Sequence, residues 1–280
     1  MRAQLILLVL IVIGGCSKPP SSELLSAPTA PTTPASLFVS SVALDRRALN
    51  GGDSTEATIA LNAPATTATV VNVSSDAPAA VNVPASVTVP AGSNNVIFSI
   101  ATSPVSEDVM STVTASLNGR TAGNRLAVWT VAANSFWYDS DVGEGIGVGL
   151  AAHVTGANAS LRAVCDGSNV FIDFNYTGAT WIGRFHLPDG VPIRPGTWGW
   201  SPGSDFSRPL LQLSGLGRGC TAGGEFTIIA ADLDPSGAVR NFVATFKQAC
   251  SGSSAVLRGE IRLANAPRGI GGGTPPRCIR

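Results

Sequence analysis

Two histidines and a scatter of carboxylates are the residues with which this chain could catalyse a reaction. His153 and His186 are the only histidines, and the sequence connects neither of them to the nucleophile turn of a serine hydrolase. We therefore expect both imidazoles on strand surfaces. A glycosidase would need only a pair of carboxylates. No spacing selects such a pair from the acidic residues of the second half, which include Asp139, Asp141, Glu144, Asp173, Asp189, Asp205, Glu225, Asp232, Asp234 and Glu260.

The glycine-rich stretch at residues 143–149 is a second candidate for chemistry. A dinucleotide-binding loop needs a strand before it and a helix after it, whereas strand-like residues follow this stretch. Asp139, Asp141 and Glu144 could supply oxygen ligands to Ca²⁺, but a complete calcium-loop signature is missing. We expect solvated carboxylates and a glycine-rich turn that leads into an edge or closely packed strand, with no metal or cofactor.

Four aromatic residues form a candidate ligand-binding platform. Trp198 and Trp200 are two positions apart, so an extended segment places both side chains on one face. Trp181 and Tyr176 lie nearby in the sequence. Exposed aromatic rings of this kind can stack on sugar rings. The alternative, which we favour, is that these rings belong to the buried core of a β-sandwich.

The five cysteines divide into Cys16 near the N-terminus and four in the second half. Cys220 precedes one long expected strand and Cys250 follows the next, so a hairpin would bring them together and form a disulfide. Exclusion leaves Cys165 and Cys278, whose pairing the sequence does not decide. An even number of cysteines is typical of an oxidising compartment, and the absence of a C-x-x-C pair argues against zinc.

The composition indicates an exported, β-rich protein. Charged residues make up 13% of the 280 residues, against about 25% in an average soluble domain. The 18 basic residues are balanced by 18 acidic ones. Proteins that bind nucleic acid concentrate positive charge on one face, so we expect no nucleic-acid partner.

Residues 1–15 predict a signal peptide. Residues 5–13 are an unbroken apolar run, much shorter than the roughly 20 residues of a membrane-spanning helix. The residues that end this segment are Ile13, Gly14, Gly15 and Cys16. They resemble the bacterial lipobox, which implies cleavage before Cys16 and acylation of its sulfur and amine, with palmitate as a typical acyl group. Several acyl chains would anchor the chain stably in a membrane, at the outer membrane or cell surface of a bacterial envelope.

Residues 16–36 predict a tether and residues 37–132 a first sandwich. The tether is rich in Pro, Ser and Thr, and such a composition favours an extended chain. Alternating β-branched residues then predict strands at 38–44, 54–61, 69–74, 80–83 with 86–89, 95–100, 110–117 and 125–131. Segments 42–44, 50–52 and 83–92 resemble a bacterial Ig-like repeat, which implies an immunoglobulin-like sandwich that serves more often as a spacer than as a binder.

Residues 135–265 predict a second, larger antiparallel sandwich, followed by a Gly/Pro-rich tail at 266–280. The expected strands are 146–154, 160–165, 169–175, 180–186, 196–200, 209–213, 224–232, 239–248 and 255–263. Segments 143–149, 187–190, 195–197, 217–220, 242–250 and 259–262 resemble a C-terminal β-sandwich domain of uncharacterised function found in exported bacterial proteins. This resemblance implies a fold and a cysteine pair, and it carries over no catalytic residue.

These observations predict an all-β protein of two β-sandwich domains after a signal peptide and a disordered tether. We expect a lipid-anchored protein of the cell envelope with a non-catalytic binding, adhesion or structural role. Its expected partners are the membrane and a surface polysaccharide or envelope protein. The alternative is a carbohydrate-active or other hydrolytic enzyme of the envelope whose carboxylates the sequence does not identify.

Overall fold

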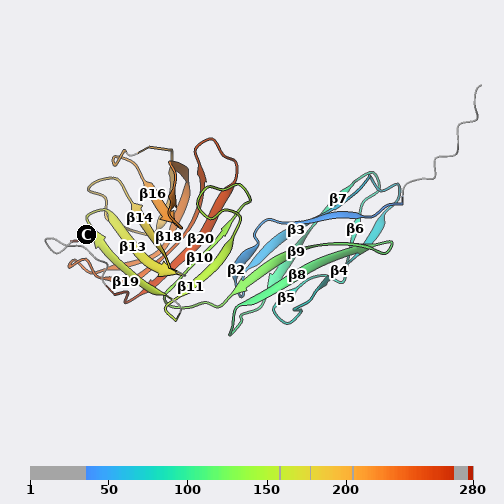
Figure 1. The fold of residues 1–280 in the computed structure, drawn as a ribbon, viewed down its shortest axis with the longest axis horizontal. Helices are drawn as coiled ribbons and strands as arrows, with labels where there is room; N and C mark the ends of the chain where they lie inside the picture. The colour runs from blue at the N-terminus through green and yellow to red at the C-terminus, as the bar shows by residue number, and fades with distance from the viewer. Residues whose placement is uncertain (1–35, 158, 177, 204, 268–276, 280) are drawn as a thin grey trace, which may run out of the picture. The chain divides into compact units, whose positions relative to one another are not determined.

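The chain folds into β-sheets throughout the part that the structure describes. The computed structural model describes residues 36–267 and 277–279, apart from 158, 177 and 204. These residues form 20 strands and no helix, arranged as two β-sandwiches (Figure 1). The all-β prediction is therefore confirmed. The expected signal peptide, Cys16, nearly all of the tether and most of the tail lie outside the described residues.

The first sandwich consists of a four-stranded and a five-stranded sheet with the orders β1-β3-β7-β5 and β2-β9-β8-β4-β6 (Figure 1). Its strands are β1 (Val39–Leu44), β2 (Ala48–Asn50), β3 (Ser54–Leu61), β4 (Thr69–Ser75), β5 (Val81–Asn82), β6 (Ser86–Val89), β7 (Asn95–Thr102), β8 (Val109–Leu117) and β9 (Arg120–Trp129). Alternate side chains of β3 are buried, and the core includes Leu49, Ile59 and Ile100. The alternation visible in the sequence therefore separates core from solvent.

The second sandwich consists of a six-stranded sheet with the order β11-β10-β20-β19-β18-β15 and a five-stranded sheet with the order β12-β13-β14-β16-β17 (Figure 1). Its strands are β10 (Ser135–Ser140), β11 (Ala151–Thr155), β12 (Ser160–Asp166), β13 (Asn169–Tyr176), β14 (Ala179–His186), β15 (Gly196–Trp200), β16 (Leu210–Gly215), β17 (Arg218–Gly219), β18 (Ala222–Leu233), β19 (Val239–Cys250) and β20 (Val256–Ala264). Aromatic rings fill much of the core between the sheets, including Phe136, Phe174, Trp181, Phe185 and Phe242.

Several segments differ from the strands expected from the sequence: β9 begins at Arg120 and not at residue 125, and β2 and β17 are additional to the expected strands. Strand β10 was not among them, and all six of its residues are buried, so it shows no alternation of polar and apolar side chains. The expected strand at 146–154 begins only at Ala151. The residues before it form turns in which Val148 and Gly149 have positive φ angles, a backbone that cannot continue a ladder.

Two disulfide bonds connect segments of the second sandwich. Cys220 and Cys250 are bonded at the open end of the β18–β19 hairpin, with Cα atoms 5.6 Å apart. Cys165 of β12 is bonded to Cys278, which also bridges Gly167 through the backbone. The hairpin prediction for Cys220 and Cys250 is thus confirmed, and the open question about Cys165 and Cys278 is answered by a bond.

Candidate functional site

The two sandwiches meet through a buried aromatic cluster. Ala48, Ala127 and Trp129 of the first sandwich pack with Trp137 of β10. Trp129 also stacks on His153 of β11, with ring centroids 5.4 Å apart. Trp137 and His153 are opposite each other on paired strands, so both side chains lie on the same face of the six-stranded sheet. This contact covers the second face of β10 and explains why that whole strand is buried.

A chain of opposite charges borders the cluster. The Asp139 carboxylate is fully buried and accepts hydrogen bonds from the backbone N–H of Arg47, at 3.1 Å, and from its guanidinium, at 2.8 Å. Arg258 of β20 donates to Asp139 at 3.0 Å and contacts Asp141 at 3.1 Å. Burial would lower the pKa of Arg258, but Asp141 and Asp139 outweigh it and raise the pKa above its usual value. The Asp139 carboxylate is therefore bound by guanidinium groups on two sides.

A second polar contact crosses the junction at Glu260, whose side chain is nearly fully buried. Asn50 at the end of β2 donates its side-chain N–H to the Glu260 carboxylate at 2.9 Å. Arg262, two residues along the same strand, donates to the same oxygen. Because a buried carboxylate is costly without such partners, these contacts favour one relative placement of β2 and β20.

Asp108 supplies a third contact. Its carboxylate lies 2.9 Å from Nδ1 of His153 and accepts hydrogen bonds from the backbone N–H and the hydroxyl of Thr130. Burial would raise the pKa of Asp108, but the hydrogen bonds from Thr130 and His153 outweigh it and lower the pKa below its usual value. The carboxylate is therefore charged at neutral pH.

A groove of about 490 Å³ opens beside these contacts, and we name it the junction groove. One wall comes from the first sandwich and includes Asp45, Arg46 and Asp53. The floor is the outer face of β18, β19 and β20. Cross-strand pairing places two rows of side chains on this floor. The rows are Glu225, Lys247 and Arg258, and Thr227, Thr245 and Glu260.

Both histidines are buried, so the expectation that they lie on strand surfaces is wrong. His153 faces the first sandwich, which the sequence of the second sandwich does not reveal. His186 is fully buried, with Nδ1 2.8 Å from the side-chain oxygen of Asn169 and Nε2 2.9 Å from the backbone oxygen of Phe206. These contacts hold the loop that contains Phe206 against β14, and they bring no nucleophile to the imidazole.

The loop that begins at the end of β15 contains a sequence motif typical of serine hydrolases. Residues 199–203 carry the letters of the G-x-S-x-G motif, with Ser201 at the centre. A nucleophile turn needs a strand before the serine and a helix after it. Strand β15 ends at Trp200, and no helix occurs anywhere in the described residues. The match therefore lacks the structural context of a hydrolase.

The aromatic platform considered as a candidate sugar-binding surface does not form. Trp181 is 1% exposed and Trp200 7% exposed, and both belong to the core. An added Cβ at Gly215 would lie 2.1 Å from the Trp181 ring, so glycine is required for the ring to pack there. Trp198 and Tyr176 are half-buried and pack against the same core. Trp198 and Trp200 do share a face, as their spacing predicted, but that face points inward, and our favoured interpretation as core is confirmed.

The glycine-rich loop is organised around Glu144. This carboxylate is nearly fully buried, and its Oε2 accepts hydrogen bonds from Ser140 and from the backbone N–H groups of Ile146 and Gly147. The prediction of a turn before an edge strand is confirmed, since β11 lies at the edge of its sheet. The expected solvation of Asp139 and Glu144 is wrong. The backbone N–H groups of Ile146 and Gly147 are thus occupied by Glu144 and are not available to a phosphate.

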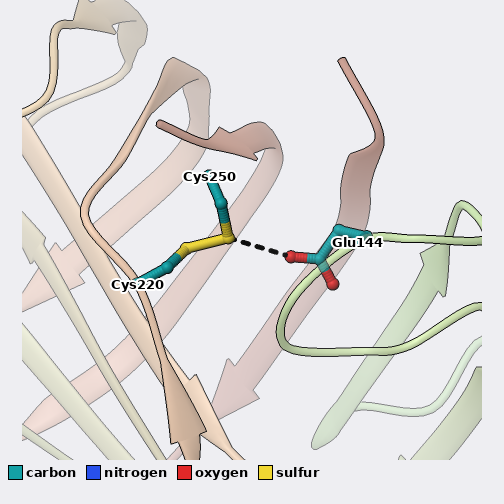
Figure 2. Close-up of side chains that lie close together, drawn as sticks. All are labelled: Glu144, Cys220 and Cys250. Carbon is teal, nitrogen blue, oxygen red and sulfur yellow. Dashed lines mark hydrogen bonds between the residues drawn. A yellow bond between two sulfur atoms is a disulfide. The ribbon is translucent and has the colours of Figure 1, made fainter. Parts of the chain in front are cut away.

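The other oxygen of Glu144 faces the disulfide. Figure 2 shows the carboxylate directed at Cys250, with Oε1 3.5 Å from Sγ and Cys220 bonded behind it. These three residues have the separations of a metal site, but sulfur atoms in a disulfide are not thiolate ligands. Asp139 and Asp141 bind Arg258, so they do not converge with Glu144 on a calcium ion either.

Sequence reasoning did not find the junction groove. Glu225, Lys247 and Glu260 lie on three different strands. Which of their side chains are neighbours, and which residues of the first sandwich face them, can be inferred only from the pairing of β18, β19 and β20.

No family model and no curated protein matches the chain. Among the described residues, no helix is long and apolar enough to cross a membrane.

Proposed function

We propose that the chain is a lipid-anchored protein of the bacterial envelope whose two sandwiches together bind a ligand without transforming it. The observation that carries the binding role is the junction groove, because both sandwiches contribute its walls and floor. Its volume lies within the range of about 300–1,000 Å³ that small-ligand sites occupy.

The location rests on two independent features. Ile13 to Cys16 resemble a lipobox, and lipidation at Cys16 would place everything after it outside the cytoplasm. The two disulfides support the same compartment, since stable disulfides are rare in the reducing cytosol.

The non-catalytic role is supported by the state of the buried carboxylates. Asp139 is held by two guanidinium groups, Glu144 by backbone donors, and Glu260 by Asn50 and Arg262. A general acid or base must lie within hydrogen-bond reach of the substrate. These three side chains are nearly fully buried and are already bound by groups of the protein itself.

The contacts at the junction support a second task for the first sandwich. A spacer would need only a covalent connection to its neighbour. Here Arg47, Asn50 and Asp108 each bind a charged or titratable side chain of the second sandwich. The first sandwich therefore contributes a wall of the binding site, in addition to any role in holding the second sandwich away from the membrane.

Co-sedimentation with isolated envelopes tests this function. The full-length Cys16→Ser chain, which lacks the anchor, is mixed with envelopes of the producing organism. We expect saturable binding and no release of soluble saccharide or peptide from the envelope. Absence of saturable binding would contradict the binding role, and time-dependent release of fragments would contradict the non-catalytic role.

A further inference from the structure

The charges that line the junction groove fall into two groups. Arg258 is bound by Asp139 and Asp141, and Arg262 is bound to Glu260. Five further lining charges have no ionic partner among the described residues, and these are Asp45, Arg46, Asp53, Glu225 and Lys247. Three are carboxylates and two are cations, and all but the half-buried Arg46 are exposed.

The paired charges hold the groove in shape, and the unpaired charges face whatever enters it. Glu225 and Lys247 are opposite each other on β18 and β19, while Asp53 stands on the first sandwich. A ligand in the groove therefore meets carboxylates from both sandwiches and a cation on the floor. Neither a strongly anionic nor a strongly cationic ligand matches this arrangement, because each would meet charges of its own sign.

The aromatic residues of the lining do not offer a stacking surface. Trp137 is 4% exposed and Phe246 5% exposed, so neither ring presents a face to a sugar. The lining is otherwise charged or hydroxylated, apart from Asn50, Ile229 and Gly259. A saccharide that depends on ring stacking is therefore a poorer match than a ligand that carries its own charges.

We propose that the junction groove binds a short peptide that carries both a side-chain amine and a side-chain carboxylate. The amine is recognised by Glu225 and Asp53, and the carboxylate by Lys247 and Arg46. Thr227 and Thr245 on the floor add hydroxyl groups for the peptide backbone. This inference rests on the proposed binding function and assigns its ligand class.

A peptide array tests the ligand class. The probe is a set of tetrapeptides with blocked ends that contain one lysine and one glutamate in every arrangement, together with all-lysine, all-glutamate and uncharged sets. The full-length protein in detergent is applied to the array. We expect retention on the mixed-charge peptides in preference to the other three sets.

Matched variants test the residues. Lys247→Ala and Glu225→Ala should each weaken binding about tenfold or more, as expected when one partner of a charge pair is removed. Asp53→Ala should do the same from the first sandwich. Arg218→Ala and Glu107→Ala change exposed charges outside the groove and should leave binding unchanged.

Several results would overturn this inference. They are equal retention of all peptide sets, preference for a single sign of charge, and equal weakening by the control variants. If envelopes bind the protein while the array shows no preference, the ligand class is wrong and the proposed function stands. If envelopes and peptides both fail to bind, the proposed function fails as well.

Discussion

Replacing Asp139 by alanine should destabilise the protein more than replacing any exposed acidic residue. The side chain is fully buried and lies 2.8 Å from Arg47 and 3.0 Å from Arg258. Removing one partner of a buried ion pair costs about 3–5 kcal/mol, because the other charge stays desolvated. Two features reduce this cost. Arg258 keeps Asp141 at 3.1 Å, and the Arg47 side chain is 27% exposed and can reach water. We therefore expect a loss of about 3 kcal/mol, at the low end of that range.

Urea unfolding is the appropriate assay, because urea is uncharged and does not screen ion pairs as guanidinium chloride does. The matched control is Asp173→Ala. Asp173 pairs with Arg162 at 2.8 Å, but both side chains are partly exposed, and such pairs contribute about 0–1 kcal/mol. Far-ultraviolet circular dichroism and tryptophan fluorescence should both report the transition.

The comparison between Asp139→Ala and Asp173→Ala tests whether the buried ion pairs of Asp139 stabilise the fold more than an exposed pair does. If Asp139→Ala lowers the free energy of unfolding no more than Asp173→Ala does, the charge chain at the junction contributes no special stability. A double-mutant cycle with Arg47→Ala adds a direct measure of the coupling. A coupling energy near zero would show that Arg47 and Asp139 are neighbours without an energetic interaction.

Four further predictions concern other parts of the molecule. Cys16→Ser should abolish acyl labelling and release the chain from the membrane fraction, and an unlabelled wild type that stays in the membrane would contradict lipidation. Cys220→Ser should lower the free energy of unfolding by about 2–5 kcal/mol, the usual cost of losing a disulfide in a small secreted domain, as measured by urea unfolding under non-reducing conditions. Trp200→Ala should cost about 3–5 kcal/mol through loss of core packing, and Trp198→Ala should cost less because Trp198 is only half-buried; equal midpoints would contradict this order. The pKa of Asp108 is lowered from 3.8, so its carboxylate stabilises the fold above that pH, and this contribution is lost as the pH falls through the folded-state pKa. Asp108→Asn should therefore make the free energy of unfolding fall less steeply as the pH is lowered through this range. An unchanged pH dependence would refute this linkage.

The alternation of polar and apolar side chains along the sequence determined most of the strands. Segments such as Ser54–Leu61 and Asn95–Thr102 have one buried face and one solvated face. The order of polar and apolar residues along the sequence is therefore enough to identify them as strands. Residues 234–237 read Asp-Pro-Ser-Gly, a turn signal between the strands expected at 224–232 and 239–248, and this signal predicts the hairpin of β18 and β19 and with it the proximity of Cys220 and Cys250. These features are local, or follow from one local turn, and they could be inferred without knowledge of any distant contact.

The face on which a side chain lies was decided by tertiary structure. The spacing of Trp198 and Trp200 correctly placed both rings on one side of a strand, but only the packing of β15 against the other sheet makes that side the interior. Strand β10 escaped prediction for a related reason. Its second face is covered by the first sandwich, so its residues show no polar alternation.

The junction itself could not be derived from the sequence. Arg47 and Asp139 are separated by 92 residues, and Asn50 and Glu260 by 210. In the sequence these are isolated polar residues on strands or turns, and each is indistinguishable from a solvated one. Burial turns them into partners because an ionised carboxylate removed from water requires a cation or hydrogen-bond donors close by. The sequence by itself thus determined most of the strands, the hairpin and one disulfide, whereas the tertiary structure decided which charges are paired and which lack an ionic partner in the junction groove.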